Sequence, residues 1–143
     1  MSVKNEALLR DWFEEVWNDK NAAAIDERMA EDTIAHGMGP NGGDLVGREA
    51  FKAMHALYCG AFPDIKMTLD PVFATDDMAA CHFICKGTHR GDHLGVAPTG
   101  KAVTIRAMTI AKFRDGKIVE GWNCVDLLPT FQEIGVVVPA STG

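Results

Sequence analysis

The sequence predicts one α+β domain, residues 1–143, in which helices pack on the concave face of a curved antiparallel sheet. Residues 5–64 repeat their apolar side chains with helical periodicity, whereas residues 65–128 alternate with strand periodicity. An Asp-Gly pair at 115–116 marks a tight hairpin turn inside the second region. A length of 143 residues suits a single domain. Helices followed by a curved sheet form a cone, and a cone leaves a ligand pocket between its two layers.

Three helices are expected in the N-terminal part. Residues 5–20 carry one apolar stripe, and residues 21–32 begin at Asn21, a favourable N-cap. A third helix is expected over residues 47–64, with a short strand at residues 33–37 before it. The tail after the sheet is expected to form a short helical turn with an apolar end.

The remaining chain is expected to form four strands and then the tail. Their predicted ranges are 65–75, 78–91, 101–116 and 117–128, with the tail over 127–139.

The expected hairpin register determines which side chains face inward. A turn centred on the Asp-Gly pair places Trp122 opposite Thr109 and Asp126 opposite Ile105. Alternation then directs Trp122 and Asp126 to the inward face and Arg106 to the outer face. The same register pairs Ile118 with Phe113, Glu120 with Ala111 and Cys124 with Ala107.

Composition excludes several classes of partner. A net charge of -6 without a basic stripe argues against nucleic acid and anionic membranes. No signal peptide or spanning segment is visible, and Cys81 and Cys85 have neither disulfide nor zinc spacing. The sequence leaves open that Cys59 and Cys124 meet in space, but four reduced thiols and a cytoplasmic location are expected. The histidines of the segment 89–93 have no distant third ligand, so no metal is expected.

Several short motifs, in their order and spacing, make the chain similar to a known family. They are Ala61-Phe62-Pro63-Asp64, Gly87-Thr88-His89, Pro98-Thr99-Gly100, Asp115-Gly116-Lys117-Ile118, and Trp122 followed by Asp126. With these motifs the chain resembles the SnoaL-like polyketide cyclases of the nuclear transport factor 2-like superfamily. The resemblance implies a cone-shaped homo-oligomer without metal or organic cofactor. It also implies ring closure by intramolecular aldol condensation, with Asp126 at the position of the family's acid/base aspartate.

The candidate catalytic residues are Asp126 and His89. An inward-facing carboxylate has a raised pKa and suits proton abstraction from carbon, but Asp126 equally fits the N-cap of the turn that follows it. His89 ends a predicted strand, where it either binds a substrate carbonyl or positions Asp126, or is a hydrogen-bonded strand-end histidine.

The candidate substrate-binding residues surround the expected pocket. His36 matches a family histidine. The others would give a flat apolar cavity for a ring system, although aromatic residues at such positions also serve as core. They are Tyr58, Phe62, Trp122 and Thr109.

Two classes of function follow from the sequence. The first is a cofactor-free acid/base enzyme acting on a small apolar carbonyl compound, by aldol cyclisation or isomerisation. Epoxide hydrolysis is less favoured, because Arg106 is expected to face away from Asp126. The second class is a non-catalytic ligand-binding or structural module of the same fold. A homodimer is expected through the outer sheet face, from its apolar residues Met108, Ile110, Val119 and Val125.

Overall fold

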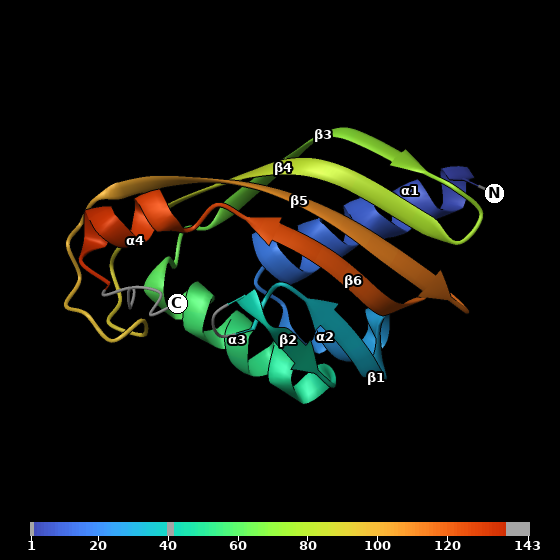
Figure 1. Cartoon of the computed structure of the whole chain (residues 1–143), viewed down its shortest axis with the longest axis horizontal. Helices are drawn as coiled ribbons and strands as arrows, with labels where there is room; N and C mark the ends of the chain where they lie inside the picture. Colours follow the sequence, from blue (N-terminus) through green and yellow to red (C-terminus); the bar gives the residue numbers. More distant parts are fainter. Residues whose placement is uncertain (1, 40–41, 137–143) are drawn as a thin grey trace, which may run out of the picture.

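The computed structural model describes residues 2–39 and 42–136. It has the predicted α+β architecture: the strands form a curved, unclosed sheet, and α1, α2 and α3 lie under its concave side (Figure 1). In chain order the elements are α1 (Ser2–Trp12), the π-helical η1 (Phe13–Asn18), α2 (Ala22–Arg28), β1 (Met29–His36), β2 (Asp44–Val46), α3 (Arg48–Ala61), β3 (Lys66–Ala74), β4 (Met78–Thr88), β5 (Ala102–Arg114), β6 (Lys117–Val125) and α4 (Leu128–Ile134).

The sheet order is β2-β1-β6-β5-β4-β3. All described strand pairs are antiparallel except β1–β6, which is parallel. The second predicted helix is shorter than expected, because Met29 pairs with Ile118 and residues 29–32 join β1. Strand β2 was not expected. The apolar end of the tail lies largely outside the described residues.

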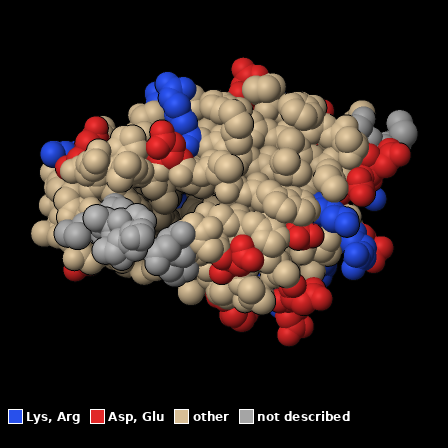
Figure 2. Space-filling view, in the orientation of Figure 1, with Lys and Arg blue, Asp and Glu red and all other residues tan. Residues whose placement is uncertain are grey.

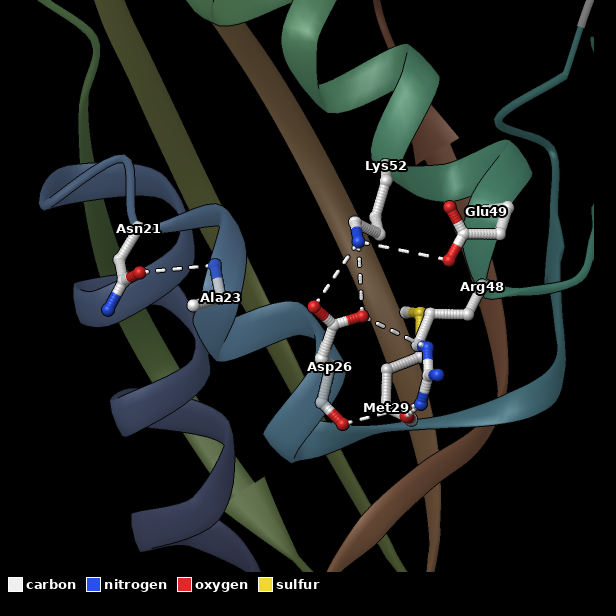
Figure 3. A network of polar contacts seen from close by, with 7 residues as sticks. All are labelled: Asn21, Ala23, Asp26, Met29, Arg48, Glu49 and Lys52. Carbon is white, nitrogen blue, oxygen red and sulfur yellow. Dashed lines mark hydrogen bonds and ion pairs between the residues drawn. The ribbon is translucent and has the colours of Figure 1, made fainter.

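The helical layer is held together by a small polar network between α2 and α3 (Figure 3). Lys52 bonds the Asp26 carboxylate at 3.2 Å, and Arg48 donates to the backbone oxygens of Asp26 and Met29 at 3.3 Å each. Asn21 is the N-cap of α2, as predicted, accepting from the Ala23 amide at 3.1 Å. These bonds fix the helices against each other and so fix the helical wall of the cone.

The predicted hairpin is present, but its register changes within the ladder. Asp115 and Gly116 have φ of 53° and 77°, as a type I′ turn requires. Phe113 pairs with Ile118 as expected, yet Lys112, the residue before Phe113 in β5, pairs with Glu120 rather than with Val119. Val119 is therefore an extra residue in β6, a β-bulge.

The bulge reverses the facing of β6 beyond it. Along β5, buried residues alternate with exposed or half-buried ones, as predicted. On β6, however, Trp122 pairs with Ile110 rather than Thr109, and Asn123 takes the inward place beside Thr109. The predicted inward facing of Glu120, Trp122 and Cys124 is wrong, because one inserted residue exchanges the two faces of a strand.

Candidate functional site

A cavity of about 790 Å³ lies between the helices and the sheet. This volume is within the range of small-molecule sites. Its floor contains Ala35, Gly121 and Ala111, which pair across β1, β6 and β5 and all line the cavity. Larger residues at these three positions would fill the space that now forms the cavity. Opposite them, α1 and α3 supply Trp12 and Met54, so the wall is mostly apolar.

Few polar groups face this cavity. Apart from tryptophan indoles and one thiol, the polar side chains of its described wall are Thr33, Tyr58, Thr109, Asn123 and Asp126. No Lys, Arg or His is among the described lining residues. The wall therefore suits a neutral ligand with a small number of oxygen functions.

Thr109 and Asn123 form a polar pair on the cavity floor. The Thr109 hydroxyl donates to Asn123 Oδ1 at 2.7 Å, and Asn123 Nδ2 donates to the His36 backbone oxygen at 3.0 Å. Thr109 is 8% exposed, which confirms that it faces inward. Its lone pairs stay available to a ligand donor, because its proton is used by Asn123.

Asp126 follows the last residue of β6 and is exposed. Its amide donates to the Arg106 backbone oxygen at 3.0 Å, which extends the β5–β6 ladder by one bond. Asp126 lines the main cavity and also a smaller depression of about 410 Å³ on the outer sheet face, shared with Arg106. The capping alternative is wrong: the N-cap of α4 is Leu127, and no side chain caps that helix.

Among the described residues, the cavity reaches the surface near Asp126. Leu57 and Leu128 also line it and are 45% and 50% exposed. We call these three residues the mouth. The carboxylate therefore lies at an exposed part of the cavity wall, in contact with water.

Tyr58 and Phe62 line the cavity from the α3 side, as expected. Phe62 is 1% exposed, whereas Tyr58 is half-buried, and burial raises the pKa of its phenol. The Tyr58 hydroxyl thus remains protonated at neutral pH and is able to donate a hydrogen bond into the cavity.

His89 lies apart from the cavity lining, fully buried in the loop after β4. Its Nδ1 accepts from the Thr99 amide at 3.1 Å and lies 3.0 Å from the Thr99 hydroxyl. Its backbone amide donates to Lys101 at 2.9 Å. These bonds close the loop 89–101, the arrangement expected of a hydrogen-bonded strand-end histidine.

His36 and Trp122 come together on the outer sheet face instead of in the cavity. Their rings stack with centroids 5.6 Å apart. His36 Nε2 lies 2.7 Å from Glu120 and Nδ1 lies 2.9 Å from Asp44, so these hydrogen bonds, Glu120 first, raise the pKa of His36. Trp122 is 37% exposed.

The sequence analysis missed Asn123 and Thr33. Both line the cavity, Asn123 because the bulge turns it inward and Thr33 as a buried residue of β1. One sequence signal for the bulge was present: Gly121 is an isolated glycine inside a strand, a frequent mark of such irregularities.

In residues 2–39 and 42–136 no group of three His, Cys, Asp or Glu side chains is placed to hold a metal ion. No helix in that part of the chain is long and apolar enough to cross a membrane. All four cysteines are free thiols, as predicted.

Comparison with known proteins places the chain among proteins of one architecture. The sequence profile of the SnoaL-like polyketide cyclases matches residues 7–134. No curated protein matches the chain significantly in sequence.

Solved structures agree with this profile. A candidate SnoaL-like polyketide cyclase from Jannaschia sp. CCS1 superposes with a TM-score of 0.83 at 22% identity, covering 96% of this chain and 95% of that one. AclR, a candidate hydroxylase from Streptomyces galilaeus, gives 0.79 at 24% identity, with 98% and 86% covered. IdmH, a candidate polyketide cyclase from Streptomyces antibioticus, gives 0.76 at 26% identity, with 92% and 99% covered.

Proposed function

Because this chain belongs to the SnoaL-like polyketide cyclase family, we propose that it removes a proton from an activated carbon of a neutral carbonyl compound held in the cavity. The reaction is an intramolecular aldol condensation or a related isomerisation, and it requires no cofactor. One observation carries the proposal: Asp126 is the one carboxylate in the described wall of a mostly apolar cavity. It is the available general base.

Ligand binding would activate this base. In the free protein Asp126 is exposed at the mouth and hydrated. A ligand that fills the cavity displaces water from the carboxylate, and loss of hydration disfavours the charged form. The bound carboxylate therefore accepts a proton from carbon more readily than the free one.

Tyr58 would supply the complementary acid. Its phenol stays protonated because burial raises its pKa. A hydrogen bond from Tyr58 to the substrate carbonyl oxygen would stabilise the negative charge that forms there when the proton leaves.

The proposed steps balance without a further reactant. Asp126 takes a proton from the carbon beside the carbonyl, and the electron pair of the C–H bond forms the enolate. The enolate carbon then bonds to a second carbonyl carbon of the same molecule, whose oxygen becomes an alkoxide. The alkoxide regains the proton from Asp126, which restores the carboxylate.

The lining also restricts the substrate's charge. A substrate carboxylate would find no Lys, Arg or His in the described wall and would be repelled by Asp126. The proposed substrate is therefore a ketone or ester without a free acid group.

A ligand-binding module remains the second candidate, since the Asp126 side chain is exposed and makes no hydrogen bond within the described residues. Epoxide hydrolysis is less well supported. It needs an arginine beside the carboxylates, and Arg106 is exposed on the outer sheet face and does not line the cavity.

We also propose a homodimer through the outer sheet face and a cytoplasmic location. Phe73, Ile110 and Trp122 lie in one cross-strand row of β3, β5 and β6, and with Met108 they form an exposed apolar patch. A partner sheet would cover that patch. The free thiols agree with a reducing compartment.

Hydrogen–deuterium exchange tests the proposed chemistry. With 2-tetralone, a neutral ketone with acidic C–H bonds, the wild type is expected to accelerate exchange in D₂O, followed by proton NMR. Asp126→Asn keeps the shape but removes the base, so exchange should fall by roughly 10²–10⁴-fold.

Asp32→Asn is the matched control, because Asp32 is exposed on β1 and does not line the cavity. This variant should exchange like the wild type. If Asp126→Asn also kept the wild-type rate, Asp126 would not be the base. If the wild type bound ketone but gave no acceleration, the binding module would be the better description.

A further inference from the structure

The second missed residue, Thr33, carries an unused hydrogen-bonding group at the cavity wall. Thr33 is 1% exposed and is one of the residues that line the cavity. Its hydroxyl oxygen has no hydrogen-bond partner within the described residues. The backbone nearby is satisfied, since the Gly47 amide donates to the Thr33 carbonyl at 2.7 Å. Only the side-chain hydroxyl is left over.

A buried hydroxyl without a hydrogen-bond partner lowers the stability of the ligand-free protein. Valine has the same shape as threonine and would fill the same space without a buried polar atom. The threonine hydroxyl loses its hydrogen bonds to water on folding and gains none from the protein. The imbalance disappears when a ligand supplies the missing partner.

The strand register places Thr33 far from the polar pair on the cavity floor. Ala35, Gly121 and Ala111 form one cross-strand row, and β1 runs parallel to β6 but antiparallel to β5. Thr33 precedes Ala35 by two residues, so it lies on one side of the row and Thr109 on the other. Thr33 and Thr109 are therefore four residues apart along the strand direction and two strand spacings apart across the sheet. This places them on the order of 15 Å from each other.

Asp126 lies on the same side of this row as Thr109 and farther along. It follows Val125, which pairs with Ala107 beyond the Thr109–Asn123 pair. Thr33 and the mouth are thus at opposite ends of the cavity. A ligand that reaches both must be elongated.

We propose that Thr33 is a specificity-determining residue whose hydroxyl binds an oxygen substituent at the inner end of the ligand. The ligand is then elongated and neutral, apolar along its middle, with a hydroxyl or carbonyl remote from the carbon that reaches Asp126. This inference rests on the proposed function only for the role of Asp126. The hydrogen bond at Thr33 requires no chemistry at the mouth.

Two neutral rod-shaped probes of nearly equal shape test the inference. 4-Phenylphenol carries a terminal hydroxyl, and 4-methylbiphenyl carries a methyl group in its place. Their dissociation constants are measured by displacement of 1-aminoanthracene, whose own affinity is determined for each variant. Because a methyl group leaves water more readily than a hydroxyl, the quantity compared is the ratio of the two dissociation constants, which the Thr33 hydroxyl should shift about tenfold toward the phenol, the effect of one net hydrogen bond.

Three variants separate the hydroxyl from the shape of the side chain. Thr33→Val should shift the ratio of the two dissociation constants about tenfold toward 4-methylbiphenyl, because the phenol hydroxyl then loses its partner, whereas Thr33→Ser should keep the wild-type ratio. Thr104→Val is the control, because Thr104 is exposed on β5. In the absence of a probe, Thr33→Val should melt at or above the wild-type temperature, since it removes a group without a partner.

Two results would overturn the inference. They are a Thr33→Val variant that keeps the wild-type ratio of dissociation constants, or one that melts well below the wild type because the Thr33 hydroxyl already had an internal partner. Asp126→Asn is titrated in parallel and should keep the wild-type preference. If Thr33→Val left the probe ratio unchanged while Asp126→Asn still lost exchange, only this inference would be refuted. If Thr33→Val changed the probe ratio while Asp126→Asn kept the wild-type exchange rate, only the proposed chemistry would be refuted.

Discussion

Replacing Asn123 by alanine tests the bulge that organises the cavity floor. Asn123 accepts from Thr109 at 2.7 Å and donates to the His36 carbonyl at 3.0 Å. The change breaks both bonds and leaves the Thr109 hydroxyl, 8% exposed, without its acceptor. At about 1 kcal/mol for each lost bond, we expect a loss of about 2 kcal/mol in unfolding free energy. For a chain of this size the melting temperature should fall by roughly 6–8 °C.

A double-mutant cycle then identifies the shared bond. Thr109→Val should cost about 1 kcal/mol, and the double variant should cost about 1 kcal/mol less than the two single losses together. Denaturant unfolding monitored by tryptophan fluorescence measures all three. In a ladder without the bulge, Asn123 would face solvent, and its replacement would change stability by no more than about 0.5 kcal/mol. Such a silent variant, or strictly additive losses, would refute the register.

Three further predictions concern reactivity, pH and assembly. Burial raises the pKa of Cys85 to about 12, whereas Cys124 is exposed, so a thiol reagent should label one cysteine quickly and Cys124→Ser should abolish that fast phase. Burial lowers the pKa of His55, whose Nε2 lies 2.6 Å from the Val16 carbonyl, so its neutral form is favoured in the folded state. The unfolded state then takes up the proton first, so the contribution of His55 to stability should decrease as the pH falls below about 6.5, opposite in sign to that of His36, and His55→Gln should lack this contribution in urea titrations. Sedimentation should show a dimer at micromolar concentration that Met108→Lys converts to monomer; a wild-type monomer would contradict the outer-face interface.

The order of elements could be predicted because each signal was local. The apolar stripe of α1 and η1, the cap at Asn21 and the turn at residues 115–116 depend on neighbours in the chain. All three are present in the structure.

The facing of the last strand could not be predicted by alternation alone. One extra residue, Val119, reverses every later side chain of β6, and its insertion is decided by how β6 fits β1 and β5 together. For this reason Trp122 was assigned to the cavity and lies outside it, whereas Asn123, which unbroken alternation would turn outward, lies inside. Asp126 still lines the cavity, but from its mouth.

The outer face shows how the same error affects the interface. Met108 and Ile110 are exposed as expected, at 61% and 43%, whereas Val125 lines the cavity. The corrected register brings Trp122 to the exposed patch in its place. Figure 2 shows that charged side chains gather toward the margins of the face it displays and leave its middle largely uncharged.

Chemical rescue of Asp126→Ala tests the central claim most directly. The alanine leaves space at the mouth, where a small carboxylate from solution is able to enter and act as the missing base. In the 2-tetralone exchange assay this variant should be inactive without added base and should regain exchange in proportion to the formate concentration, while the wild type stays unaffected by formate. An Asp126→Ala variant that exchanges at the wild-type rate without formate would contradict the claim that this carboxylate removes the proton.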